Sequence, residues 1–346
     1  MIPVRGYAAP QPGAPLKPHA FERRSPVRHD VVIDILYCGI CHSDIHSARG
    51  EWGEGTFPLV PGHEIVGRVS GRGPKTRRFK VGDVVGVGCY VESCGACPSC
   101  RSNLEQHCAR GPVFTYGDKD RFGRTTQGGY STRIVVDENY VLRIPRGLPP
   151  DKAAPLLCAG ITTYSPLRRW NIGPGKTLGV VGLGGLGHMA VKFGAAMGAR
   201  VLVISTSPRK APEARRLGAR GFLLSTDKKG LAKHASSLDL VIDTVSANHP
   251  MEPLFDLLKR DGTLVMVGAS PTALAVPPFA LILGRKQLAG SLIGGLKETQ
   301  EMLDYCGRRK ITPDIETIAP AEINRAYARV VKGDVRYRFV IDCGKF

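Results

Sequence analysis

The 346-residue sequence predicts an α/β protein with a doubly wound parallel sheet, and two observations lead to this prediction. First, a G-x-G-x-x-G motif at residues 182–187 follows an apolar run, Leu178–Val181, and opens a helical stretch, Gly187–Gly198. Second, six apolar runs alternate with helical patterns, which is typical of parallel strands joined by crossover helices. The predicted strands are Leu178–Val181, Val201–Ile204, Gly221–Leu224, Leu238–Thr244, Thr263–Gly268 and Leu288–Ile293.

The glycine motif has the spacing of a dinucleotide-binding turn. Gly182 permits a tight turn, Gly184 lets the backbone approach a pyrophosphate, and Gly187 allows close packing of helix against strand. The N-terminus of the helix would offer N–H groups and a positive dipole end to the phosphates. Glycine-rich turns are common, so the motif alone is weak evidence. Its position between a strand and a helix nevertheless favours a dinucleotide site, in which Gly185 and Leu186 complete the loop.

The segment after the second strand predicts which nicotinamide dinucleotide binds. An NAD-preferring site usually has an acid here, which holds the ribose 2′-hydroxyl. This chain instead has Ser205-Thr206-Ser207-Pro208-Arg209-Lys210, with hydroxyls and cations. A carboxylate would repel a 2′-phosphate, whereas hydroxyls and cations can bind one. We therefore predict NADP(H) as the cofactor, with its 2′-phosphate held by Ser205, Thr206, Ser207 and Lys210.

Composition and charge restrict the class of protein. Hydrophobic residues make up 42% of the chain and charged residues 23%, which fits a globular protein. Arg or Lys interrupts every long apolar stretch, so we expect no association with a membrane. The first ten residues lack the apolar core of a signal peptide, and we expect a cytoplasmic protein. The net charge of +18 comes from scattered basic residues, so we expect no nucleic-acid partner.

Ten cysteines in such a chain point to metal binding or catalysis rather than to disulfides. Four of them follow the spacing C-x2-C-x2-C-x7-C; they are Cys94, Cys97, Cys100 and Cys108. Four thiolates at this spacing can surround one Zn²⁺ tetrahedrally and close its coordination sphere, which predicts a structural zinc. Four reduced thiols and an iron–sulfur cluster are the alternatives, although the spacing differs from both ferredoxin patterns.

The length of the chain suits two domains, and further strands are expected outside the six-stranded sheet. They are Val31–Leu36, Ile65–Ser70, Val84–Val87, an alternating stretch from Gln127 through Val136, and Tyr337–Ile341.

Five short motifs follow one another along the chain. They are Gly39-Ile40-Cys41-His42-Ser43-Asp44, Pro61-Gly62-His63-Glu64, the four-cysteine lobe, Cys158-Ala159-Gly160 and Gly182–Gly187. In their order and mutual spacing they resemble the zinc-dependent medium-chain alcohol dehydrogenases, most closely the cinnamyl alcohol dehydrogenase branch and its bacterial aldehyde-reductase relatives. The resemblance covers nearly the whole chain.

The resemblance implies a division of the chain into two domains. A GroES-like, β-rich catalytic domain would comprise residues 1–159 and 293–346, with the structural zinc lobe at about residues 89–110. A Rossmann dinucleotide-binding domain would comprise residues 160–292, and the active site would lie between the two domains.

By this resemblance, Cys41, His63 and Cys158 hold a catalytic zinc, so that two zinc ions are expected per chain. This two-cysteine, one-histidine set is the known ligand set of alcohol dehydrogenase. Two thiolates and a neutral imidazole cancel the charge of Zn²⁺ and leave one position open to an alcohol or carbonyl oxygen.

Cys38 forms C-x2-C with Cys41, but the resemblance places the metal on Cys41, so Cys38 is interpreted as a small buried hydrophobe. The same interpretation applies to Cys89, Cys306 and Cys343.

The resemblance also implies roles for the residues around this zinc. Ser43 would pass the alcohol proton by way of the cofactor ribose to His46, which exchanges it with solvent. Asp44 would hydrogen-bond His63 and fix its tautomer, and Glu64 would lie behind the zinc. From the residue types alone, His46 could equally be a surface histidine and Ser43 a simple helix cap.

Three further residues complete the predicted site. Thr162, which follows the Cys158 motif, is assigned to cofactor binding, and Trp52 and Tyr90 to the substrate pocket. An aromatic lining would suit aryl or medium-chain aliphatic aldehydes, although either aromatic residue could instead pack in the core.

The predicted reaction is reversible hydride transfer between NADP(H) and a primary alcohol/aldehyde pair, in a homodimer joined along Leu281–Ile293. Three alternatives remain: a zinc dehydrogenase for polyols or secondary alcohols, a zinc-independent reductase of activated double bonds, and a basic zinc-bearing nucleic-acid binder. A substrate panel distinguishes the polyol or secondary-alcohol dehydrogenase. The zinc-independent reductase should lack the Cys41, His63 and Cys158 set. Salt-dependent binding to DNA or RNA would favour the nucleic-acid binder.

Overall fold

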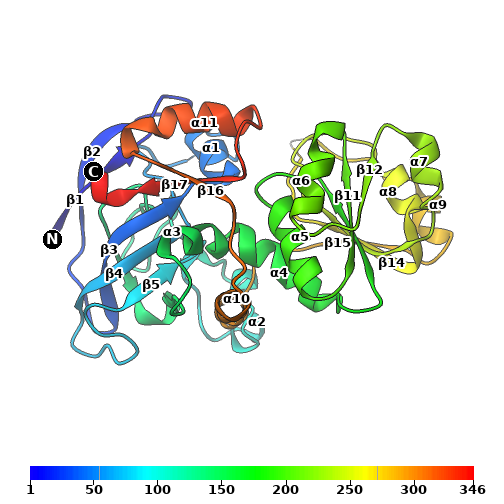
Figure 1. Ribbon diagram of the computed structural model, residues 1–346. Coiled ribbons are helices and arrows are strands. Elements are labelled where there is room, and N and C mark those ends of the chain that lie inside the picture. Colours follow the sequence, from blue (N-terminus) through cyan, green and yellow to red (C-terminus); the bar gives the residue numbers. More distant parts are fainter. Residues whose placement is uncertain (54, 271) are drawn as a thin grey trace. The chain divides into compact units, whose positions relative to one another are not determined.

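The computed structural model describes residues 1–53, 55–270 and 272–346, and its chain forms two compact units (Figure 1). The first unit contains Met1–Ile161 and Gly294–Phe346, and the second contains Thr162–Ile293. The second unit is therefore an insertion into the first. Among the described helices, none is long and apolar enough to cross a membrane.

The first unit is built on a seven-stranded sheet with a β-hairpin and a short additional strand pair beside it. Its strands are β1 (Ile2–Ala8), β2 (Lys17–Arg23), β3 (Asp30–Gly39), β4 (Ile65–Arg72), β5 (Val84–Val87), β6 (Tyr90–Glu92), β7 (Val113–Phe114), β8 (Arg133–Asp137), β9 (Leu142–Arg143), β16 (Ile315–Ile318) and β17 (Arg338–Asp342). The sheet order is β16-β17-β3-β4-β5-β9, with β8 also paired to β3. Strands β16 and β17 run parallel, and the other neighbours in this sheet run antiparallel.

Strand β3 organises this unit. It is ten residues long, and its β-branched side chains Val31, Ile33 and Ile35, which alternate along the strand, are at most 4% exposed, as expected for the face of a strand that packs on the core. It ends at Gly39 and places Cys41 at the start of helix α1. The helices of the unit are α1 (His42–Arg49), α2 (Pro98–Arg101), α3 (Pro150–Ala153), α10 (Leu296–Arg309) and α11 (Ile323–Val331), while α4 (Ala159–Arg169) leads into the second unit.

The second unit holds the six-stranded parallel sheet, so this prediction is confirmed. Its strands are β10 (Thr177–Val181), β11 (Arg200–Ser205), β12 (Gly221–Leu224), β13 (Leu238–Asp243), β14 (Leu258–Met266) and β15 (Gln287–Gly290). The order β12-β11-β10-β13-β14-β15 reverses between β10 and β13, as in a doubly wound sheet. In Figure 1, the helices flank both faces of this sheet. They are α5 (Gly187–Ala196), α6 (Ala211–Arg216), α7 (Lys228–Ala232), α8 (Glu252–Asp256) and α9 (Pro278–Ile282).

One predicted strand is wrong over half its length. The alternating stretch from Gln127 through Val136 forms a strand only from Arg133, as β8. The glycines at its start instead bind the main chain of the loop before β4: Gly128 N–H donates to Val60 O at 2.7 Å, and Gly129 N–H donates to Gly62 O at 2.8 Å. A side chain at Gly128 would meet Pro61 O at 2.3 Å, so this backbone contact needs glycine.

The core of the second unit generates a first prediction. Phe255 is fully buried in α8, and Phe255→Ala should destabilise this unit by about 3–5 kcal/mol because it leaves a large cavity. Thermal unfolding followed by circular dichroism should show a midpoint lowered by several degrees. The matched control is Phe114→Ala, at a residue 43% exposed, which should lower it much less. Equal effects of the two substitutions would contradict this description of the core.

Candidate metal centres and nucleotide site

A buried cluster in the first unit brings together Cys41, His63, Glu64 and Cys158, with one ligand atom of each lying within 4.8 Å of the others. Cys41 caps the N-terminus of α1 directly after β3, while His63 and Glu64 immediately precede β4. Cys158 follows the 3-10 turn Ala154–Leu157. Three separate turns at strand and helix ends therefore deliver the donor groups.

The geometry of this cluster fits a zinc ion. The Sγ atoms of Cys41 and Cys158 are 3.9 Å apart, close to the ~3.8 Å expected between two thiolates that bind one tetrahedral zinc at about 2.3 Å. The Nε2 atom of His63 is buried and has no hydrogen-bond partner in the described part of the chain, whereas its Nδ1 lies 3.3 Å from Asp44 Oδ1. A buried nitrogen without a partner is costly, and a metal ion would satisfy it.

The electrostatics of the two thiols favour a thiolate at Cys41. The hydrogen bond with the Cys158 thiol lowers the pKa of Cys41 well below its ordinary value, and the Arg338 charge acts in the same direction. The same hydrogen bond raises the pKa of Cys158, since the two sulfurs share a proton in the metal-free pair. Binding of a divalent cation would release that proton.

Asp44, assigned by sequence to hydrogen-bond His63, is fully buried in the first turn of α1. In addition to facing His63 Nδ1, its carboxylate accepts hydrogen bonds from Cys41 N–H at 2.8 Å, Gly62 N–H at 3.1 Å and Tyr130 O–H at 2.9 Å. Sequence reasoning missed Tyr130 as part of this site. The sequence signal that could have identified Tyr130 is the pair of glycines before it, because these glycines permit the close approach of two backbone segments.

Glu64 is fully buried and forms an ion pair with Arg338, which sequence reasoning also missed because the two residues are 274 positions apart. Burial raises the pKa of Glu64 to about 7, against the opposing effect of the arginine charge. Glu64 Oε2 and Arg338 Nε each lack a hydrogen-bond partner among described residues. A Cβ atom at Gly39 would meet Glu64 Oε2 at 1.9 Å, so Gly39 leaves the space that the carboxylate occupies.

The residues assigned to proton transfer lie on or just after α1. The Sγ atom of Cys41 is 3.6 Å from Ser43 Oγ. His46 Nδ1 is 2.5 Å from Glu51 Oε2, and the His46 ring stacks on Trp52 with centroids 5.0 Å apart. Sequence reasoning did not find Glu51. Because its carboxylate binds Nδ1, the Nε2 atom of His46 is left to accept or donate a proton.

The aromatic residues assigned to the substrate pocket differ in exposure. Trp52 is 58% exposed, whereas Tyr90 is 4% exposed and donates its hydroxyl to Gly294 O at 3.2 Å. Tyr116 was not singled out in the sequence, yet its ring stacks on His63 with centroids 5.7 Å apart. Of these three aromatic residues, Tyr116 is the one whose ring contact is with a residue of the metal cluster.

The second metal cluster consists of the four cysteines of the lobe between β6 and β7, whose sulfurs lie within 4.8 Å of one another. Backbone N–H groups point at these sulfurs: Ala109 N–H donates to Cys97 Sγ at 3.4 Å, and Cys97 N–H donates to Cys94 Sγ at 3.3 Å. The bond from Ala109 is the main cause that lowers the pKa of Cys97 to about 6. Four convergent sulfurs, some with N–H donors, fit a closed structural zinc site.

The cysteines interpreted as small buried hydrophobes divide into two groups. Cys38, Cys306 and Cys343 are at most 3% exposed, which confirms that interpretation. Cys89 is only partly buried, and its thiol hydrogen-bonds with Cys158. For Cys89 the interpretation was therefore wrong, because the turn after β5 brings it beside the metal cluster.

In the second unit, the glycine loop between β10 and α5 has the geometry of a dinucleotide cradle. Gly182 has φ +86°, which side chains disfavour, and a Cβ at Gly187 would meet Gly182 O at 2.2 Å. By contrast, a Cβ at Gly184 would have nothing within 4 Å, so that the backbone faces open space there. Gly185 and Leu186 complete the loop, and α5 begins directly after it, so that the positive end of its helix dipole lies at the loop.

The residues assigned to the 2′-phosphate follow the carboxyl end of β11. Ser205 is the last residue of the strand, and Ser207 N–H donates to its Oγ at 3.4 Å. Thr206 and Lys210 are exposed. Thr162 is 7% exposed in α4, at the start of the second unit. Thr206 and Lys210 thus remain accessible on a short turn without a carboxylate, whereas Ser205 is only 7% exposed.

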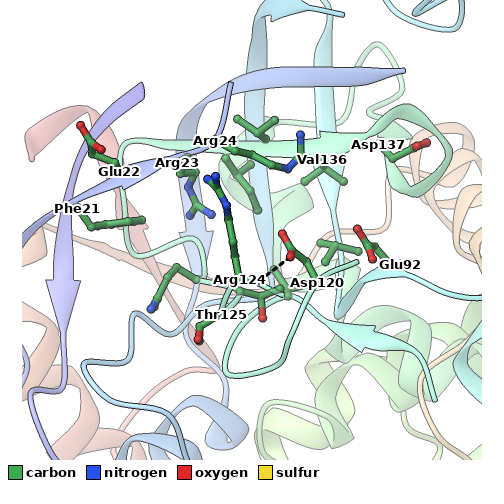
Figure 2. Close-up of a pocket in the computed structure, with 16 residues that line it drawn as sticks. Phe21, Glu22, Arg23, Arg24, Glu92, Asp120, Arg124, Thr125, Val136 and Asp137 are labelled. Carbon is green, nitrogen blue, oxygen red and sulfur yellow. Dashed lines mark hydrogen bonds between the residues drawn. The ribbon is translucent and has the colours of Figure 1, made fainter. Parts of the chain in front are cut away.

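A separate cavity of about 100 Å³ lies against β2, β6, β8 and residues 115–127 (Figure 2). Its lining contains none of the metal-cluster residues. Charges of both signs line it, those of Arg23, Arg24 and Arg124 and those of Glu22, Glu92, Asp120 and Asp137. The Asp120 carboxylate accepts a hydrogen bond from the main-chain N–H of Arg124 at 2.9 Å. This mixed lining favours neither an anionic nor a cationic ligand.

Comparisons with known proteins show the family of this chain. Two family models match the chain, the alcohol dehydrogenase GroES-like domain at residues 27–146 and the zinc-binding dehydrogenase at residues 185–307. A probable mannitol dehydrogenase of Fragaria ananassa is 55% identical over 341 residues, which are 98% of this chain and 95% of the relative. The NADP-dependent alcohol dehydrogenase C 1 of Mycolicibacterium smegmatis is 54% identical over 343 residues, covering 99% and 98% of the two chains.

Among solved structures, a cinnamyl alcohol dehydrogenase of Sorghum bicolor has a TM-score of 0.96 at 48% sequence identity, covering 99% of this chain and 98% of that one. The sequence motifs, the two metal clusters and these similarities lead to one conclusion: the chain belongs to the zinc-binding alcohol dehydrogenase family, with a GroES-like domain and a Rossmann-type nucleotide-binding domain.

Proposed function

We propose that this protein is a zinc-dependent, NADP(H)-dependent alcohol dehydrogenase that interconverts primary alcohols and aldehydes, and that aldehyde reduction is the favoured direction in cells. The observation that carries the proposal is the donor set of Cys41, His63 and Cys158, in which two sulfurs and an unpartnered imidazole nitrogen converge. Three protein ligands leave one zinc position for the substrate oxygen, as a catalytic site requires. NADP-dependent relatives support the choice of cofactor.

When bound, zinc supplies a Lewis acid that polarises the substrate oxygen, and NADPH supplies the hydride. The chain's own residues hold the metal and move the proton. Arg338 stabilises the Cys41 thiolate by its charge, and Asp44 holds Nδ1 of His63 so that Nε2 is directed to the metal. Glu64 lies beside these ligands and keeps the Arg338 charge in place.

In the proposed reduction, Ser43 donates its hydroxyl proton to the product oxygen, and His46 restores that proton from solvent. The contact of Ser43 with Cys41 supports its placement at the reacting centre. The hydrogen bond between His46 and Glu51 supports the role of His46, because a carboxylate on Nδ1 fixes the tautomer and leaves Nε2 for proton exchange.

The proposed substrates have apolar bodies, either aromatic or medium-chain aliphatic. Tyr90 and Trp52 supply ring surface, and the Tyr90 hydroxyl is already bound to Gly294 O, so that this residue offers its ring rather than a donor. A polyol is the second candidate substrate class, because a relative at 55% identity is named a probable mannitol dehydrogenase.

We further propose a cytoplasmic homodimer. Strand β15 is the outer strand of its sheet, and Leu288 on it is 40% exposed, while Phe279, Ile282 and Leu283 in and after α9 are 63–69% exposed. An unpaired strand edge beside exposed apolar side chains favours pairing with a second copy. A reducing compartment suits the protein because six cysteines are assigned as zinc thiolates.

The assay that tests the proposed function follows NADPH oxidation with cinnamaldehyde, benzaldehyde and hexanal, with fructose for the polyol alternative and with NADH in parallel. Turnover of the aldehydes with NADPH is expected. Cys158→Ser should leave about one zinc per chain and reduce kcat/KM at least a thousandfold, because a catalytic ligand is lost. Cys306→Ser, at a buried cysteine outside both clusters, should keep two zinc ions and the activity. Full zinc without aldehyde turnover would overturn the proposal.

The cofactor proposal predicts a change of preference for Ser205→Asp. A carboxylate at this position would repel the 2′-phosphate and accept the ribose hydroxyl of NAD, so the ratio of kcat/KM for NADPH to NADH should fall by about tenfold or more, or ~1.4 kcal/mol. Ser236→Asp adds the same charge just before β13, at the amino ends of the parallel strands rather than at their carboxyl ends, and should leave the ratio unchanged. An unchanged ratio in the Ser205 variant would remove this residue from the phosphate site.

The dimer proposal predicts that Leu288→Lys produces a monomer, because two charged edges would be brought together. Light scattering after size-exclusion chromatography measures the mass directly. Val81→Lys, at a 59% exposed residue of the first unit, is the control and should remain a dimer. A wild-type monomer at micromolar concentration would refute the proposed dimer.

A further inference from the structure

The carboxylate of Asp44 is enclosed by donors of different kinds. Two are main-chain N–H groups, those of Cys41 and Gly62, and a third is the ring nitrogen of His63. The fourth is the hydroxyl of Tyr130, at 2.9 Å from Oδ2. Tyr130 is therefore the one side-chain donor, apart from the metal-ligating histidine, that the described chain aims at this buried carboxylate.

The backbone of Tyr130 is joined to the loop that carries His63. Tyr130 N–H donates to Pro61 O at 3.0 Å, next to the hydrogen bond from Gly129 N–H to Gly62 O. Gly62 has φ +106°, and a Cβ atom there would meet Tyr130 Cδ1 at 2.6 Å. The two segments can approach this closely only with glycine at position 62, so the Tyr130 ring is held against the turn that presents the ligand.

The direction of the Tyr130 hydroxyl proton is also determined. Tyr327 O–H donates to the Tyr130 oxygen at 3.4 Å, and the two rings meet edge to face with centroids 6.3 Å apart. Because the Tyr130 oxygen accepts the hydrogen bond from Tyr327, its own proton is available to donate to Asp44. Burial raises the pKa of Tyr130 well above its ordinary value, so the hydroxyl remains protonated.

We propose that Tyr130 is a positioning residue of the catalytic zinc centre: its hydroxyl orients the Asp44 carboxylate, and the carboxylate in turn holds the His63 ring with Nε2 directed to the metal. This inference rests on the proposed function, in which His63 is a zinc ligand. Partners that orient a metal-bound histidine through its second nitrogen typically change metal affinity or activity 10–100-fold when they are removed. Tyr130 acts one hydrogen bond further out, through the carboxylate.

Tyr130→Phe tests this role because it removes the hydroxyl and keeps the ring. Asp44 Oδ2 still has the Cys41 N–H as a donor, so the carboxylate is not left unpaired and the fold should persist. Tyr327→Phe is the matched control: it removes a buried hydroxyl from the adjacent ring, but leaves the hydrogen bond from Tyr130 to Asp44.

The measurement is zinc release from the full-length protein to a chromogenic chelator, with zinc counted by mass spectrometry. Release of the two zinc ions is expected in two kinetic phases. The catalytic phase, which is the release of the catalytic zinc, is the one that Cys158→Ser lacks. The structural phase, which is the release of zinc from the cysteine lobe, is the internal standard. Tyr130→Phe should accelerate the catalytic phase about tenfold and leave the structural phase unchanged. Tyr327→Phe should stay within about twofold of wild type, since the hydroxyl it removes makes only a long hydrogen bond.

A double-substitution cycle separates positioning from general loosening. Asp44→Asn should itself accelerate the catalytic phase, and adding Tyr130→Phe to it should have little further effect if both act through one carboxylate. Additive effects, an unchanged catalytic phase in Tyr130→Phe, or acceleration of both phases would each overturn the inference. A wild-type protein that binds only the structural zinc would instead refute the proposed function.

Discussion

The burial of metal-binding side chains is the constraint on which the rest of the first unit depends. Two thiols, an imidazole and a carboxylate converge away from water, where each would be costly without a partner. A cation bound between the two sulfurs and His63 Nε2 would offset most of the free-energy cost of burying these groups. The remaining charge, on Glu64, is compensated by Arg338, which lies on β17 beside β3 in the same sheet. The unit therefore supplies both the donors and the groups that make their burial tolerable.

Glycines determine how closely the segments around the metal centre approach. At Gly39, a side chain would occupy the position of the Glu64 carboxylate, and at Gly62 it would collide with Tyr130. In the second unit, Gly187 has the same function toward the carbonyl of Gly182, where the first helix meets the first strand. In the motifs around the metal cluster of this chain, one residue supplies a donor atom and a nearby glycine leaves room for another chain segment.

Hydrogen bonds from the main chain orient both metal clusters, but they do so differently. At the cysteine lobe, N–H groups such as that of Ala109 point directly at sulfur, which favours thiolates in a site that remains closed. At the Cys41 cluster, the N–H groups of Cys41 and Gly62 point at Asp44 instead. There the protein orients an intermediate carboxylate, and the proposed catalytic metal would keep one position open. The contrast fits the two proposed tasks, since a structural ion needs no further ligand and a catalytic ion must admit substrate.

Much of the architecture and the donor sets could be predicted from sequence because the signals are local. The parallel strands are apolar runs bounded by turns, and the glycine motif and the four-cysteine lobe each lie within a short segment. The partners that surround the donors could not be predicted. Arg338 reaches Glu64 from the far end of the chain, Tyr130 reaches Asp44 through a glycine turn that was predicted as strand, and Cys89 lies beside Cys158. Sequence determined which donor groups and glycines are candidates to hold metal and cofactor, since residue type and spacing record chemistry. Only the tertiary structure decided which neighbours orient these groups, because hydrogen bonds between distant segments leave no periodic pattern.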